Sequence, residues 1–103
     1  MTPLLQQAMA HHQRGQLVEA EQLYRAVIAQ DPAHFDALHM LGVLCLQRGD
    51  AVAAASVLAQ AVRVNGQSAP VLCNLGLALQ TQQRWQDALS YYDRALALNG
   101  SFP

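Results

Sequence analysis

The sequence contains no lysine, and its six cationic side chains are all arginines. Charged residues make up 13% of the 103 positions, and the formal net charge is −1. A protein that binds nucleic acid through its phosphates needs a basic excess, so we expect no nucleic-acid partner. The apolar content of 52% also excludes a disordered, strongly charged tail and favours one compact domain.

Cysteines and long apolar runs are also scarce. The two cysteines, Cys45 and Cys73, cannot form a disulfide framework and are typical of a reducing compartment, so we expect a cytoplasmic protein. The longest apolar stretch, residues 51–59, is interrupted by Ser56 and is far shorter than the roughly 20 residues of a membrane span. The first fifteen residues lack the basic start and apolar run of a signal peptide. We therefore expect no membrane partner.

Patterns that carry catalytic or metal chemistry are missing as well. The histidines are His11, His12, His34 and His39, and no two of them have the i,i+4 spacing with which one helix holds a metal. We predict a core or half-buried position for His11 and a helix start for His34. The sequence has no phosphate-binding loop and no nucleophile elbow. We expect no catalytic residues, no metal, no cofactor and no enzymatic activity.

What the sequence does have is an internal repeat with a period of 34 residues. Residues of similar size recur at this spacing: Leu4, Leu38 and Leu72; Ala8, Gly42 and Gly76; Ala20, Ala54 and Ala88; Tyr24, Leu58 and Tyr92. The pattern predicts a single domain, residues 1–103, with repeats at about 1–34, 35–68 and 69–102. Because no polar capping helix follows the third repeat, we expect the chain to be a piece of a longer protein.

Each repeat contains two helical patterns joined by a short turn. The apolar periodicity predicts six helices, over residues 3–13, 17–30, 34–47, 51–63, 69–81 and 85–97. Gly49 suits the left-handed residue after a helix, and Asp50 suits the next N-cap. Short turns make successive helices antiparallel.

Glycines inside two of the predicted helices point to close packing. Gly42 and Gly76 each cost about 1 kcal/mol relative to alanine, which close approach of the paired helix would offset. We expect that approach at the small residues Ala54 and Ala88. The large residues at the positions of Tyr24, Leu58 and Tyr92 would then fill the gap toward the next helix pair.

The repeat resembles that of the tetratricopeptide repeat (TPR) family. Its pattern is clearest in the third copy, at Leu72, Leu75, Gly76, Leu79, Trp85, Ala88, Tyr92 and Ala95. The resemblance implies an all-α, right-handed α-solenoid of three helix-turn-helix repeats with six antiparallel helices. One departure is Gln83, which stands where the family has a turn glycine.

The segment from Asn74 to Leu98 also resembles the repeats of protein O-linked N-acetylglucosamine transferases. In that family, an asparagine at the repeat position of Asn74 lines the superhelix and holds peptide backbone. The equivalent positions in the first two repeats are Gln6 and Met40, so the asparagine ladder is not continuous in this chain.

The TPR resemblance implies that the first helix of each repeat lines a concave groove. The candidate groove residues are Leu5, Met9, His12, His39, Val43, Leu46, Cys73, Asn74, Leu77 and Gln80. This set has no lysine or arginine, whereas family members that clamp a carboxylate use Lys, Arg and Asn there. It favours a protein or peptide partner with apolar anchors. The apolar members could instead pack against neighbouring helices.

We therefore expect a protein–protein interaction module that binds a partner peptide in the concave groove. Two alternatives stay open: a non-catalytic docking arm of a larger enzyme such as a glycosyltransferase, and a small adaptor of secretion or pilus assembly. The last helix carries Trp85, Leu89, Tyr92 and Leu96 with no following helix to cover Tyr92 and Leu96. This face predicts a homodimer.

Overall fold

A computed structural model describes residues 3–99 of the chain, which form six α-helices and no strand. The helices are α1 (Pro3–Gln13), α2 (Leu17–Gln30), α3 (Phe35–Gln47), α4 (Ala51–Val64), α5 (Ala69–Thr81) and α6 (Trp85–Asn99). The periodicity of the sequence predicted all six, with each end within two residues of its observed position. No helix among these residues has the length and apolar character needed to cross a bilayer.

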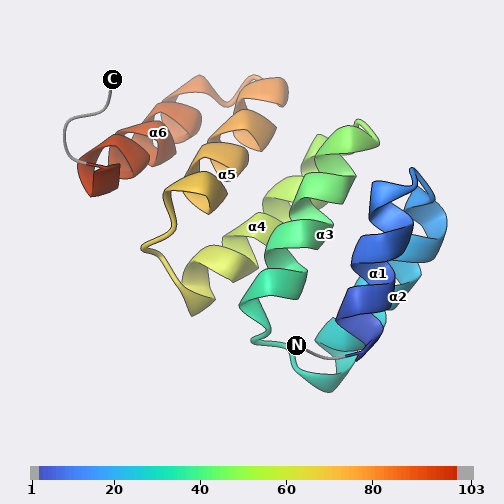
Figure 1. Ribbon diagram of the computed structural model, residues 1–103. Coiled ribbons are helices and arrows are strands. Elements are labelled where there is room, and N and C mark those ends of the chain that lie inside the picture. The colour runs from blue at the N-terminus through green and yellow to red at the C-terminus, as the bar shows by residue number, and fades with distance from the viewer. Residues whose placement is uncertain (1–2, 100–103) are drawn as a thin grey trace.

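The helices form three antiparallel pairs that stack one after another (Figure 1). Helix α1 packs on α2, α3 on α4, and α5 on α6, while α2 and α4 each also pack on the first helix of the next pair. The first helices of the pairs, α1, α3 and α5, therefore follow one another along one side of the stack (Figure 1). This is the predicted all-α solenoid of three repeats.

Local signals in the turns explain where the helices begin. The side chain of Asp50 accepts a hydrogen bond from the Ala53 backbone N–H at 3.0 Å, as an N-cap does. His34 caps α3 in the same way through Nδ1, which confirms its predicted place at a helix start. Gly49 has a φ of +77°, in the left-handed region that glycine adopts without steric cost. Gln83 stands at the equivalent turn position with a φ of +63°.

The contacts of the helical glycines differ from the expected approach to the small residues Ala54 and Ala88. A Cβ on Gly42 would lie 2.4 Å from Cδ2 of Leu58, and one on Gly76 would lie 2.8 Å from Cε1 of Tyr92. Leu58 and Tyr92 of the second helices thus pack across the glycines of their own repeats. The neighbouring alanines, such as Ala54, are buried but are not among the nearest contacts of the glycines.

Candidate functional site

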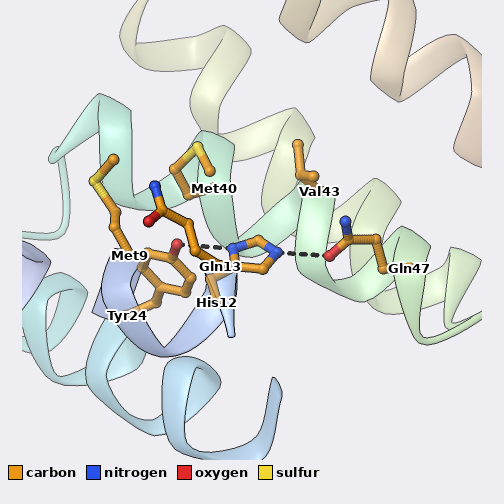
Figure 2. Close-up of a pocket in the computed structure, with 7 residues that line it drawn as sticks. All are labelled: Met9, His12, Gln13, Tyr24, Met40, Val43 and Gln47. Atoms are coloured by element: carbon orange, nitrogen blue, oxygen red, sulfur yellow. Dashed lines mark hydrogen bonds between the residues drawn. The ribbon is translucent and has the colours of Figure 1, made fainter. Parts of the chain in front are cut away.

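A cavity of about 380 Å³ lies between α1 and α3, with one side chain from α2 beside it (Figure 2). Its lining residues are Met9, His12, Gln13, Tyr24, Met40, Val43 and Gln47. The structure therefore brings together three of the predicted groove residues, which are Met9, His12 and Val43. Tyr24 was not a predicted groove residue, because its repeat position places it on the second helix of the pair.

His12 connects both walls of this cavity through its two ring nitrogens (Figure 2). Nδ1 lies 2.9 Å from the Tyr24 hydroxyl, and Nε2 lies 2.6 Å from Oε1 of Gln47. Since the amide oxygen of Gln47 only accepts, Nε2–H is the donor and Nδ1 accepts from Tyr24. Burial raises the pKa of the Tyr24 phenol, so the hydroxyl proton stays available for this bond. The imidazole is thereby held in one orientation.

A smaller cavity of about 150 Å³ adjoins the first one. Its lining residues are Leu5, Met9, Asp36, His39 and Met40. Met9 and Met40 line both cavities, so the two form one groove along α1 and α3, which we call the α1/α3 groove. Leu5, a predicted groove residue, lines this smaller cavity from the core side, since it is only 1% exposed and packs in the hydrophobic core.

His39 links the α1/α3 groove to α5. It is half-buried, and the amide nitrogen of Asn74 donates to its Nε2 at 3.4 Å. Desolvation by burial lowers the pKa of His39, while the nearby Asp36 carboxylate partly opposes that shift. His39 is therefore neutral at pH 7, with Nε2 as the acceptor.

Asp36 is the one charged side chain among the residues that line the two cavities, and it is exposed. The carboxylate makes no ion pair within residues 3–99. No arginine lines either cavity. The α1/α3 groove therefore has apolar walls, with the His12 imidazole and amide groups at one end and the His39 imidazole beside a single negative charge at the other.

The remaining predicted groove residues lie on α3 and α5 and line neither cavity. Leu46 and Cys73 are half-buried, whereas Leu77 is 45% exposed. Gln80 is also exposed and accepts a hydrogen bond from the Tyr92 hydroxyl. Cys45, which is buried, and Cys73 are free thiols. Within residues 3–99, no three His, Cys, Asp or Glu side chains gather in a way that could hold a metal ion.

The predicted self-association face on α6 is only partly exposed. Trp85 and Leu89 are each 59% exposed, and Leu96 is 41% exposed. Tyr92 departs from the expectation that it lacks cover, because its ring packs over Gly76 and is half-buried. The exposed part of this face is therefore carried by three residues.

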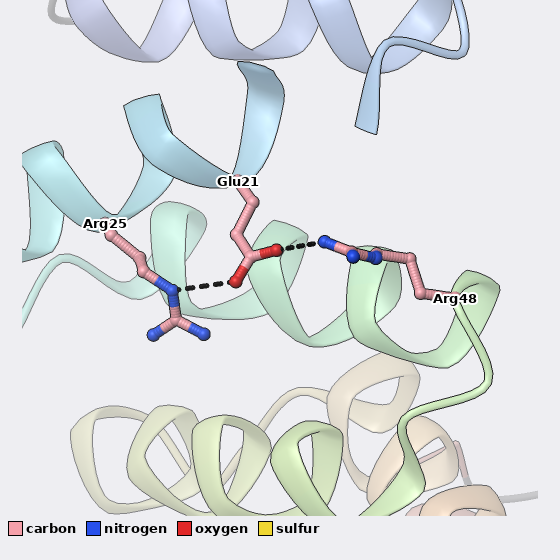
Figure 3. Close-up of polar contacts among 3 residues, drawn as sticks. All are labelled: Glu21, Arg25 and Arg48. Atoms are coloured by element: carbon pink, nitrogen blue, oxygen red, sulfur yellow. Dashed lines mark hydrogen bonds and ion pairs between the residues drawn. The ribbon is translucent and has the colours of Figure 1, made fainter. Parts of the chain in front are cut away.

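An ion-pair network joins the first two repeats (Figure 3). Glu21 of α2 pairs with Arg25 one helical turn on, at 3.0 Å, and with Arg48 at the end of α3. One period later the same positions are Ala55, Ala59 and Gln82, and they line an open crevice of about 450 Å³ between α4 and α6.

Comparison with known proteins supports the TPR resemblance. A family model described as tetratricopeptide repeat matches residues 11–75, and a second model with the same description matches residues 69–102. No curated protein matches the sequence.

Several solved structures have the same fold at low sequence identity. The first TPR of Spaghetti (RPAP3), bound to HSP90 peptide SRMEEVD, has a TM-score of 0.91 at 20% identity, over 96% of this chain and 79% of that one. The Yersinia enterocolitica type III secretion translocator chaperone SycD also has a TM-score of 0.91, at 17% identity, over 97% of this chain and 69% of that one.

A crystal structure of MamA has a TM-score of 0.89 at 18% identity, over 93% of this chain and 56% of that one. The chain thus spans little more than half the length of MamA. These likenesses show a shared fold. With the two family matches, which together cover residues 11–102, they establish that the chain belongs to the tetratricopeptide repeat family.

Proposed function

We propose that the chain is a protein-interaction module that binds a peptide segment of a partner in the α1/α3 groove. The observation that carries the proposal is the groove itself. Two adjoining cavities share Met9 and Met40, and His12 is held between Tyr24 and Gln47 at one end. An exposed groove with apolar walls and a few oriented polar groups is typical of a binding site.

Two structural neighbours support peptide binding. Both the first and the second TPR of Spaghetti (RPAP3) are described as bound to HSP90 peptide SRMEEVD. The proposal is one of binding, without catalysis and without a cofactor. No separate observation favours a docking arm of a glycosyltransferase or a secretion adaptor. The free thiols Cys45 and Cys73 support the proposed cytoplasmic location.

The test is selection of peptides from a random phage-displayed library, followed by calorimetric titration of the peptides that are enriched. Val43→Asp should abolish binding, because it places a charge in the apolar wall of the larger cavity. Val52→Asp is the control, since Val52 lies on α4 and is 67% exposed. Circular dichroism should show the same helix content for both variants. Binding that survives Val43→Asp would place the site elsewhere.

The other predicted groove residues can be tested with the same peptides. Leu77→Asp should weaken binding only if the peptide continues from the α1/α3 groove onto α5. Asn74→Ala tests whether this asparagine holds peptide backbone, as the resemblance to the O-linked N-acetylglucosamine transferase repeats implies. In this structure, one amide hydrogen of Asn74 is already directed to His39.

We also propose that a second copy of the chain associates through α6. The exposed face carries Trp85, Leu89 and Leu96, and the adjacent Arg84 and Asp87 are paired at 2.8 Å. A patch with both charges can pair with itself about a two-fold axis. Sedimentation should show a dimer that Leu89→Glu with Leu96→Glu disrupts and that Val18→Glu, on α2, leaves intact. A wild-type chain that sediments as a monomer at high concentration would refute this proposal.

A further inference from the structure

We propose that the α1/α3 groove selects a peptide with an apolar side chain and a basic side chain two residues apart in an extended backbone. The apolar side chain occupies the larger cavity, and the basic side chain lies beside Asp36 at the smaller one. This inference rests on the proposed peptide binding and goes further by naming the chemistry of the partner.

The larger cavity fits an uncharged side chain. Its apolar wall is formed by Met9, Met40 and Val43, and flexible methionines adapt to side chains of different shape. Its polar groups are the amides and the His12 imidazole, whose hydrogen bonds use one ring nitrogen as donor and the other as acceptor. A charged side chain there would lose hydration without meeting an opposite charge.

The smaller cavity fits the long side chain of a lysine or an arginine. Leu5, Met9 and Met40 provide an apolar surface for the methylene stem, and the Asp36 carboxylate provides a partner for the charged end. The neighbouring His39 is neutral at pH 7 and so does not compete as a cation. An acidic side chain at this place would be repelled by Asp36.

The spacing of the two side chains follows from the geometry of α3. The α3 residues lining the larger cavity lie within 40–47, and those lining the smaller one lie within 36–40. The midpoints of these segments are separated by about 8 Å, at roughly 1.5 Å per helical residue. Two residues of an extended chain advance by about 6.6 Å, and their side chains point to the same side.

The same groove should reject the peptide bound by the structural neighbour. SRMEEVD ends in a glutamate pair, a valine and an aspartate, so its carboxyl end is strongly acidic. No lysine or arginine lines either cavity, and the one charge there is negative. We therefore expect this chain to bind a basic peptide at least tenfold more tightly than SRMEEVD.

The experiment begins with the enriched library peptides described above. The expected consensus is an apolar residue, any residue, then Arg or Lys, or the reverse order. Replacing the basic residue by Glu in a consensus peptide should weaken binding at least tenfold. If peptides are enriched and are sensitive to Val43→Asp but show no such spacing, this inference is wrong and the proposed function stands. If no peptide is enriched, the proposed function fails and this inference fails with it.

Variants at Asp36 then test the charge directly. Asp36→Asn should weaken the binding of a consensus peptide by about three- to fivefold, since exposed ion pairs contribute up to about 1 kcal/mol. Asp36→Glu should restore binding, and Asp36→Arg should reverse the preference from a basic to an acidic peptide. Asp93→Asn, on the exposed surface of α6, removes the same charge away from the groove and should leave binding unchanged. Equal binding by wild type and Asp36→Asn would overturn the assignment of the basic side chain.

Discussion

The Tyr92 hydroxyl donates a hydrogen bond of 2.9 Å to the side-chain oxygen of Gln80. Two periods earlier, the Tyr24 hydroxyl makes the same contact with His12, also at 2.9 Å. In the middle repeat, both equivalent positions are leucines, Leu46 and Leu58. The two residues at these positions thus match in polarity in each repeat, and in the first and third repeats a hydrogen bond between them joins the two helices. The pairs differ in burial, because Tyr24 is fully buried whereas Tyr92 is half-buried.

Removing these hydroxyls should affect stability unequally. Tyr24→Phe should lower the free energy of unfolding by about 1–2 kcal/mol, because Nδ1 of the half-buried His12 loses its donor. Tyr92→Phe should cost less than about 0.5 kcal/mol, because Gln80 is exposed and water can replace the phenol. Urea denaturation of the two variants measures the difference. Equal losses would show that burial does not decide the value of this contact.

Adding one methyl group at Gly42 should be destabilising. The new Cβ would lie 2.4 Å from the buried side chain of Leu58, so the overpacking cost exceeds the roughly 1 kcal/mol that alanine gains over glycine in a helix. We expect a net loss of about 1 kcal/mol in Gly42→Ala. In a Leu58→Ala background the same change should become stabilising. A double-mutant cycle by chemical denaturation tests this reversal, and additive effects would contradict the contact.

Gln83→Gly should stabilise the fold. Gln83 has a φ of +63°, whereas Gly15 and Gly49 have this left-handed backbone at the equivalent turns. Relief of the strain on a residue with a Cβ should raise the free energy of unfolding by about 0.5–1 kcal/mol. Gln22→Gly, on the exposed face of α2, is the control and should lower it by about 1 kcal/mol. Thermal melting compares the two variants, and a lower melting temperature for Gln83→Gly than for wild type would contradict this prediction.

The stability of the fold should fall in mild acid through His39. Burial holds the pKa of His39 below its ordinary value of 6.5, so the unfolded chain takes up this proton first as the pH falls. The contribution of neutral His39 to the free energy of unfolding is therefore complete above pH 6.5. It is lost as the pH falls from there through the folded-state pKa. Urea titrations at pH 7.5 and 5.5 should show that the free energy of unfolding falls more for wild type than for His39→Gln between these two pH values. The same loss in both proteins would contradict this assignment.

The sequence alone determined the six helices and the order in which they pair. The signals are local: apolar residues recur at helical spacing, Gly49 permits a left-handed turn, and Asp50 and His34 have side chains that cap the next helix. The period of 34 residues then repeats one helix pair three times, and short turns leave antiparallel packing as the compact solution. None of these features depends on contacts between distant residues.

Tertiary structure decided which side chains meet in the groove and which do not. Periodicity assigns a residue to a helix face, but it does not say what lies opposite that face. His12 could be assigned to α1, yet its orientation depends on Gln47, which is 35 residues away. Leu5 shares the inner face with Met9, yet packing buries it almost completely. Glu21 meets Arg48 only because α2 packs on α3, since contacts between helices are set by how the pairs stack.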